Sequence, residues 1–174
     1  MHEAVYDLET VIAGVAPVLR ARPAARLVIA GGGSRTAALE RLAAATLPEG
    51  RWRFIGLLGP EALAEWLARA EVYVSASRSD STSLSLLEAM AAGALPVVSD
   101  IEGNREWVGE GDGARLFAPG VPAALAAALA RALDGSDGEA IRARNRGVVE
   151  ARADRGRNME RIASLFASLA RGAA

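Results

Sequence analysis

The chain has 174 residues, 51% of them hydrophobic, which is enough for one domain with a substantial core and too few for two ordinary domains. Its 20 basic and 21 acidic residues leave a net charge of −1, so no overall field attracts nucleic acid or a membrane surface, and we expect no nucleic-acid partner. The absence of cysteine excludes disulfides and thiolate metal sites, and His2, the single histidine, is expected at a frayed terminus, so we predict no metal site.

The sequence carries no visible targeting signal. No apolar run reaches the length of a bilayer span and no signal peptide is recognisable, so we expect a cytoplasmic protein. Arginines gather in residues 142–161, but acidic residues are interleaved with them. This alternation is typical of solvated helix faces rather than of a phosphate-binding stripe.

Helices and strands are predicted to alternate along the chain. A first helix is expected over residues 6–21, where Pro17 favours a kink or an early end. Strands are predicted at 27–30, 52–55, 72–75, 96–99 and 114–117. Helices are predicted between and after them at 36–46, 60–70, 84–92, 105–108, 123–133, 137–151 and 158–171, with a turn at 109–113.

Strands that alternate with helices and glycine turns predict an α/β fold. We expect a Rossmann-like parallel sheet with helices on both faces. The prediction is a single domain over residues 1–174, with only helices from about residue 121 onward.

A polar loop follows the predicted strand at 72–75 and precedes the predicted helix at 84–92. Ligands of open α/β sheets bind at the carboxyl ends of the strands, so this loop is the candidate site. Three residues of the loop and of the helix after it also have purely structural interpretations. Ser85 and Glu88 have the spacing of a capping box, and Asp80 suits a turn in which its side chain bonds its own backbone.

The functional interpretation of the same loop is an anion site. Backbone N–H groups of Ser83, Leu84 and Ser85, together with the positive end of the helix dipole, would bind a phosphate or diphosphate. The carboxylates of Asp80 and Glu88 would then accept hydrogen bonds from sugar hydroxyls. Spacing alone favours the capping box for Ser85 and Glu88, because such boxes are common at helix starts.

An ordered series of motifs resembles one family. Asp80, seven residues and then Glu88 resemble the Glu-x7-Glu signature of the GT4-type retaining glycosyltransferases of GT-B fold. Four further stretches are similar to that family. Residues 27–33 resemble its second strand and the glycine turn after it, and residues 54–56 resemble its third strand. Residues 103–107 resemble the loop after its fifth strand, and residues 113–117 resemble its sixth strand. The chain thus resembles the C-terminal, donor-binding half of such an enzyme.

The resemblance implies a nucleotide-diphosphate sugar as substrate and no cofactor. Glu88 would bind the ribose hydroxyls, Asp80 would stand at the catalytic position where the family's first Glu contacts the donor sugar, and the amides of residues 83–85 would meet the diphosphate. The resemblance also assigns donor binding to the backbone of Ile55, Gly56 and Leu57, beside the base, and to Gly33. The reaction would transfer the sugar to an acceptor with retention of anomeric configuration. A peripheral membrane acceptor stays compatible with this, because a lipid-linked acceptor leaves no trace in the donor domain.

The sequence also departs from the family pattern. Asp80 is one methylene shorter than the usual Glu, and Ser81 stands where the family has Gly. The family's diphosphate-binding Arg and Lys belong to a first strand and the turn after it, and the Lys position falls near Ala4. The acceptor-binding N-terminal domain is missing, so we expect the isolated chain to be inactive.

The missing first strand has a physical consequence. In the strand order 3-2-1-4-5-6 that strand lies in the middle of the sheet. Without it, the strands at 27–30 and 72–75 would either pair directly or leave two unpaired edges. We therefore expect either an excised fragment or self-association by strand exchange.

Two other interpretations agree with part of the pattern. A dehydrogenase half would also give a strand, a glycine turn and a helix, but the third glycine is replaced by Thr36 and the acidic ribose ligand by Arg51. A non-catalytic module that binds a nucleotide sugar or another protein remains an alternative. Arg35 and Arg78 are either substitute phosphate ligands or exposed, solvated side chains.

Overall fold

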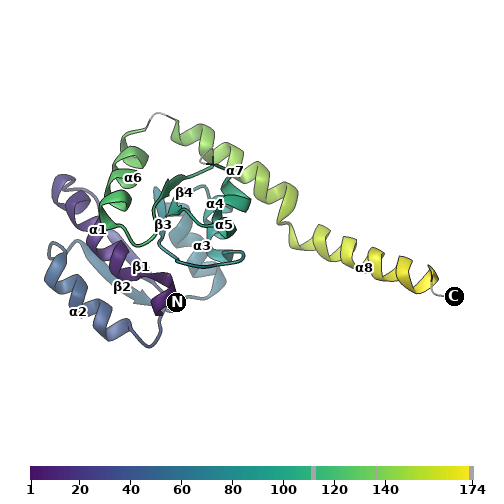
Figure 1. Cartoon of the computed structure of the whole chain (residues 1–174), viewed down its shortest axis with the longest axis horizontal. Coiled ribbons are helices and arrows are strands. Elements are labelled where there is room, and N and C mark those ends of the chain that lie inside the picture. Colours follow the sequence, from purple (N-terminus) through teal and green to yellow (C-terminus); the bar gives the residue numbers. More distant parts are fainter. Residues whose placement is uncertain (111–112, 136, 173–174) are drawn as a thin grey trace.

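The computed structural model describes residues 1–110, 113–135 and 137–172, and its elements follow the predicted alternation (Figure 1). The strands are β1 (Leu27–Ala30), β2 (Trp52–Gly56), β3 (Val72–Ser75), β4 (Leu95–Ser99) and β5 (Arg115–Phe117). A short 3-10 helix, η1 (Ala4–Tyr6), precedes α1 (Leu8–Ala21), α2 (Thr36–Thr46), α3 (Pro60–Arg69), α4 (Leu84–Ala92), α5 (Glu102–Val108), α6 (Pro122–Asp134), α7 (Gly138–Arg152) and α8 (Arg155–Gly172). The turn predicted at 109–113 includes residues 111–112, which lie outside the described residues.

Local signals explain where these helices begin and end. Pro60 is the first residue of α3, where its missing N–H leaves no helical hydrogen bond unmade. Gly93 ends α4 with a φ of +84°, the left-handed conformation that glycine adopts without steric cost. Helix α1 continues through Pro17 to Ala21, so the early end that this proline favours does not occur.

The strands form two parallel sheets instead of one. β1 pairs with β2, and β3 pairs with β4, which pairs with β5. Within the described residues no hydrogen-bonded ladder joins β1 to β3. Of the two outcomes expected for a sheet without its central strand, the structure therefore has the second, with two unpaired edges.

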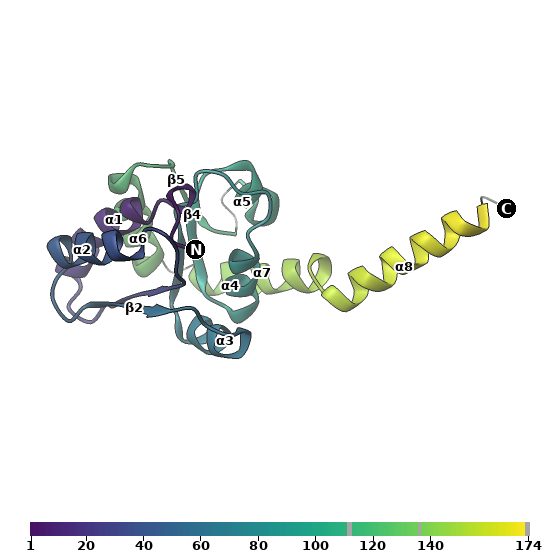
Figure 2. The same cartoon turned by 90° about the horizontal axis from the view of Figure 1, so that it is seen from below.

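Helices cover both faces of the strands (Figure 2). Helices α1, α2 and α6 lie on one face, and the main core cluster joins them to residues of both sheets, such as Ile29 of β1 and Val97 of β4. Helices α1 and α6 approach closely, because a Cβ on Gly14 would lie 2.8 Å from the Cδ2 atom of Leu125. On the other face, α4 packs with α3, α5 and α7.

The N-terminal segment is docked, which corrects the prediction of a frayed terminus. The His2 side chain is 1% exposed, and its Nδ1 atom lies 2.9 Å from the Thr36 hydroxyl. The His2 N–H donates to the carbonyl of Gly32 after β1, and the carbonyl of Val5 accepts from the N–H of Arg78 after β3. Residues 2–5 therefore connect the carboxyl ends of the two sheets.

Helix α8 extends away from the rest of the chain in both views (Figures 1 and 2). It exposes the large apolar side chains of Met159, Ile162, Leu165, Phe166 and Leu169. Among the described residues, no helix combines the length and apolarity that a membrane span requires.

The two unpaired strand edges predict self-association. We expect size-exclusion chromatography with light scattering to show species larger than a monomer whose fraction rises with protein concentration, because open edges template pairing with another chain. A monomer at all concentrations, with the β-sheet signal of circular dichroism intact, would contradict this prediction.

Candidate functional site

The loop between β3 and α4 ends in a helix cap that differs from the predicted one. Ser83 is the N-cap, and its hydroxyl accepts a hydrogen bond from the Leu86 N–H at 3.3 Å. Glu88 is then the fifth helical residue, two positions beyond the third residue, which is the partner of the N-cap in a capping box. The structural interpretation of Ser85 and Glu88 as a capping box is therefore wrong.

The start of α4 presents one exposed face. Leu84, Ser85 and Glu88 lie within one third of the helix circumference, because residues three and four apart stack on the same side. All three are exposed, and the Leu84 side chain is exposed to 72%. The first N–H groups of this helix have no intrahelical acceptor, so the predicted amides of Leu84 and Ser85 and the carboxylate of Glu88 share one solvent-facing surface, whereas Ser83 is buried at its edge.

Tyr73 of β3 contacts the start of α4 through a chain of hydroxyl groups. Its hydroxyl lies 2.7 Å from the Ser85 Oγ atom, which lies 3.2 Å from the Ser83 Oγ atom. Burial raises the pKa of the Tyr73 phenol, and the negative charge of Asp80 raises it further, whereas hydrogen bonds with Ser85, Ser83 and Ser75 lower it. The net effect is a pKa above the ordinary value of 10.0, so the phenol stays neutral and holds the two serines in place.

Asp80 is half-buried, and the first turn of α5 fixes its position. A Cβ added to Gly103 would lie 2.1 Å from the Asp80 carbonyl oxygen and 2.9 Å from the Ser81 carbonyl oxygen. The next residue, Asn104, donates from Nδ2 to the Ser99 carbonyl at 2.8 Å. Because only glycine leaves room for the loop, Gly103 determines how closely residues 80–81 approach α5.

Ser81 does not need the conformational freedom of the glycine found in the family. Asp7 is the one non-glycine residue with positive φ among the described residues, so Ser81 has an ordinary backbone conformation.

The predicted base-binding residues lie at the end of β2. The Gly56 carbonyl accepts a hydrogen bond from the Gly31 N–H at 2.7 Å, which holds the turns after β1 and β2 together. The Leu57 side chain is 81% exposed, and its Cγ atom lies 3.7 Å from where a Cβ on Gly32 would be. Ile55 is half-buried and Gly56 is exposed. Residues 55–57 follow β2 of the two-stranded sheet, whereas the exposed face of α4 follows β3 of the three-stranded sheet. Both lie at the carboxyl ends of their strands.

Gly33 is already in close contact with the N-terminal segment. A Cβ there would lie 2.5 Å from the Glu3 Oε1 atom, and that carboxylate accepts hydrogen bonds from the Ser34 N–H at 2.8 Å and the Ser34 hydroxyl at 2.6 Å. These bonds lower the pKa of Glu3. Gly33 therefore allows close packing of Glu3, and donor binding by Gly33 stays a prediction.

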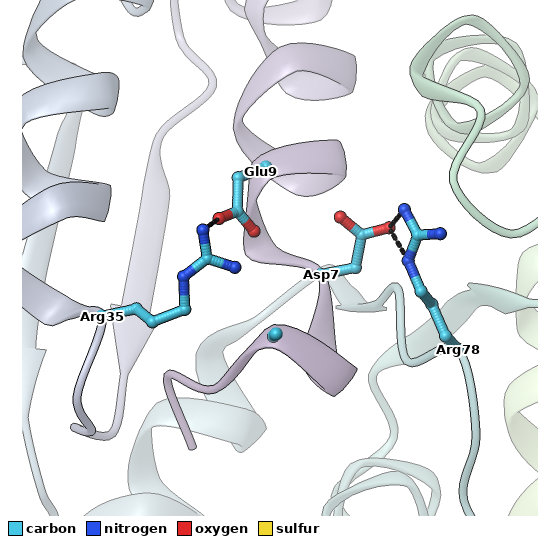
Figure 3. A pocket seen from close by; sticks show the side chains of 5 residues that line it. Asp7, Glu9, Arg35 and Arg78 are labelled. Atoms are coloured by element: carbon cyan, nitrogen blue, oxygen red, sulfur yellow. Dashed lines mark hydrogen bonds and ion pairs between the residues drawn. The ribbon is translucent and has the colours of Figure 1, made fainter.

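A pocket of about 440 Å³ lies at the start of α1. Its lining residues are Ala4, Asp7, Glu9, Arg35 and Arg78. Figure 3 shows Arg35 reaching toward Glu9 from the start of α2, and Arg78 reaching toward Asp7 from the β3–α4 loop. Asp7 is the N-cap of α1, with φ +46° and ψ +49°, and its carboxylate also accepts hydrogen bonds from the N–H and hydroxyl of Thr10. The pocket therefore holds two guanidiniums and two carboxylates.

The described residues contain no group of three or more His, Asp and Glu side chains that could hold a metal ion. The polar groups gathered at the candidate site are backbone amides, carboxylates, hydroxyls and guanidiniums.

Comparison with known proteins identifies the family. The sequence profile described as "Glycosyl transferases group 1" matches residues 1–135 of the 174. The chain belongs to this family. No curated protein sequence matched the chain.

Solved glycosyltransferase structures share the fold. Sucrose-phosphate synthase from Thermosynechococcus elongatus is 24% identical with a TM-score of 0.86, over 98% of this chain and 44% of that one. HepE from Anabaena, in complex with UDP and glucose, is 18% identical with a TM-score of 0.84, over 95% and 46%. The catalytic domain of cholesterol-α-glucosyltransferase from Helicobacter pylori is 20% identical with a TM-score of 0.75, over 86% and 93%.

The chain spans less than half the length of most of these structures, including TarM from S. aureus, of which it covers 34%. The expected α/β architecture of the C-terminal, Rossmann-like half of a GT-B glycosyltransferase is confirmed.

Sequence reasoning did not find three residues that organise the site. Gly103 was noted only as part of a family-like loop, and no sequence signal indicated its contact with Asp80. Tyr73 was assigned to a strand core, and Asp7 to an ordinary helix. The combination of Asp7 and Thr10 at a helix start is an N-cap signal that could have located the true start of α1.

Stability above neutral pH tests the environment of Tyr73. Because the folded pKa lies above the unfolded one, the unfolded phenol ionises first, so the stability it contributes is present below pH 10 and is lost as pH rises further. We expect the free energy of unfolding in denaturant to fall more steeply between about pH 9 and about pH 11 for the wild type than for Tyr73→Phe. Equal slopes would show that the phenol titrates as it does in the unfolded chain.

Gly103→Ala tests the contact that positions Asp80. The added methyl overlaps the Asp80 carbonyl, so we expect a loss of about 1–3 kcal/mol in the free energy of unfolding, measured by urea denaturation. Gly147→Ala on α7 is the matched control, because nothing lies within 4 Å of a Cβ there. A Gly103 variant as stable as this control would mean that the loop relaxes at no cost.

Proposed function

We propose that this chain is the donor-binding domain of a retaining, GT4-type glycosyltransferase that transfers a sugar from a nucleotide-diphosphate sugar to an acceptor. The observation that carries the proposal is the exposed face of α4, where Glu88 and the free amides of the first helical turn stand together at the carboxyl end of β3. The family membership and the UDP and UDP-glucose complexes of structurally similar proteins support it.

In the proposed complex each part of the site binds one part of the donor. Glu88 accepts hydrogen bonds from the ribose hydroxyls, and the amides of Ser83, Leu84 and Ser85 bind the diphosphate. Asp80 contacts the sugar from the loop that Gly103 holds in place. The base lies against the backbone of residues 55–57, and Gly33 is at the edge of the site.

The proposed reaction makes one main demand on this domain. The bond between the anomeric carbon and the diphosphate oxygen breaks with its electron pair on the diphosphate, where negative charge develops. The acceptor hydroxyl oxygen forms the new bond to that carbon, and its proton passes to the departing diphosphate or to water. Amides and cations that already point at this group stabilise the charge without having to reorganise. The domain supplies these groups as the protein's own residues, so the proposed mechanism uses neither a cofactor nor a metal ion.

The acceptor half of the site belongs, in this proposal, to an N-terminal domain, and the isolated chain is inactive. This agrees with the share of the similar full-length structures that the chain covers. One of those structures is a complex of two proteins, GtfA and GtfB. We propose a cytoplasmic setting, where nucleotide sugars are the donors, with an acceptor that is either free or attached to a membrane.

A non-catalytic nucleotide-sugar-binding or interaction module is the second candidate. The pocket between α1, α2 and the β3–α4 loop favours it, because both arginines there are paired with carboxylates and Ala4 lacks a charge. A chain of this kind would keep the fold and lose the capacity to stabilise a leaving diphosphate.

Isothermal titration of the chain with UDP, GDP and ADP tests the proposal. We expect one of them to bind, and Glu88→Gln to weaken that binding by about tenfold to a hundredfold, because a hydrogen bond to a charged group is lost. Glu40→Gln is the matched control, since Glu40 is also an exposed fifth residue of its helix, α2. Binding of none of the three nucleotides would favour an interaction module, and equal affinity of the Glu88 variant would remove the assigned ribose contact.

A further inference from the structure

We infer that Arg35 and Arg78 are the cationic ligands of the donor diphosphate in this chain, an inference that rests on the proposed donor site. The two guanidiniums approach the start of α1 from opposite sides and line the same pocket (Figure 3). They come from the two loops that carry the other predicted donor contacts, the turn after β1 and the loop after β3. A ligand that spans from one sheet to the other at this edge therefore meets both.

Arg78 pairs with one carboxylate. Its Nε atom donates to the Asp7 Oδ2 atom at 2.9 Å, its Nη2 atom lies 2.8 Å from the same oxygen as an ion pair, and its backbone N–H donates to the Val5 carbonyl at 2.8 Å. The guanidinium also lies beside Gly120, where an added Cβ would be 3.1 Å from Nη2. The Asp7 side chain is 6% exposed, whereas that of Arg78 is 59% exposed. A guanidinium has five N–H donors, so the outer edge of Arg78 stays open to an anion while Asp7 fixes its direction.

Asp7 is committed to this positioning role. Its carboxylate accepts two hydrogen bonds from Thr10, and its left-handed backbone conformation is uncommon for a residue other than glycine. The carboxylate therefore has little freedom to turn into the pocket or to follow Arg78 toward a ligand. A fixed acceptor behind a cation orients that cation before the ligand arrives, which lowers the entropy lost on binding.

Arg35 is restrained more weakly. It pairs with Glu9 in the first turn of α1, and the two side chains are 41% and 33% exposed. Ion pairs with this much solvent exposure contribute little to stability, so a diphosphate with at least two negative charges competes well with one carboxylate for Arg35. Glu9 then competes with the donor diphosphate for Arg35, whereas Asp7 orients Arg78 for binding of that diphosphate.

Other arginines near these strands have different partners. Arg51 donates to the carbonyls of Arg22 and Ala25, and the guanidinium of Arg53 lies 4.7 Å from the ring centroid of Trp66. Arg105 donates through two nitrogen atoms to Asp100. The methyl group of Ala4 lines the pocket in place of a long side chain, so the cations that line it are Arg35 and Arg78.

Titration calorimetry with the nucleoside diphosphate that the wild type binds best tests this assignment. We expect Arg35→Ala and Arg78→Lys each to weaken binding by about tenfold or more, because a charge-assisted hydrogen bond or its fork geometry is lost. Lysine is chosen at position 78 so that buried Asp7 keeps a positive partner. We expect Glu9→Gln to tighten binding severalfold, an increase that a merely structural role of Glu9 would not produce.

Arg69→Ala is the control for the change in net charge, because Arg69 is exposed on α3 and pairs only loosely with Glu65 at 3.8 Å. Its affinity should equal that of the wild type. If Arg35→Ala and Arg78→Lys bind as tightly as the wild type, the assignment is overturned while the donor site stands. If the wild-type chain binds none of UDP, GDP and ADP, the assignment and the proposed function both fail.

Discussion

The packing of α1 across two separate sheets is the interaction on which the rest of the structure depends. In the described part of the chain, no backbone ladder connects β1 to β3. Ile12 and Leu19 of α1 are buried in the cluster that also contains Ile29 of β1 and Val97 of β4. Burial of each such side chain contributes about 1.5–3 kcal/mol, so helix packing does the joining that a central strand would do. This packing, together with the hydrogen bonds of residues 2–5 to the ends of β1 and β3, aligns the strand ends that form the candidate site.

Much of the fold could be predicted because its signals are local. The glycine turn before Thr36 and the apolar spacing after it define α2 residue for residue, and Gly93 marks the end of α4. The predicted range of α4, residues 84–92, agrees with the structure, but its capping residue could not be predicted, because Ser83 and Ser85 are both suitable caps and the choice depends on the path of the preceding loop. That path is determined by the contact between Asp80 and Gly103, which sequence spacing does not reveal.

The candidate site follows the same division between local and long-range signals. The α4 face follows from a strand, a polar loop and a helix that are adjacent in sequence. The burial of His2 and the pairing of Arg78 with Asp7 require contacts between distant segments, and their sequence surroundings look like an ordinary terminus and an ordinary loop. The charged pocket therefore became visible only in three dimensions, although both of its arginines were noted in the sequence.

The pair of Asp7 and Arg78 also has a consequence for folding. It joins residues 71 positions apart in the chain, and the closure of so long a loop costs conformational entropy before any contact compensates for it. Contacts of this range raise the mean sequence separation of a fold, which slows folding in general. The loop that carries Asp80 thus depends on the N-terminal segment, which supplies it with the Asp7 carboxylate and the Val5 carbonyl from the far end of that long loop.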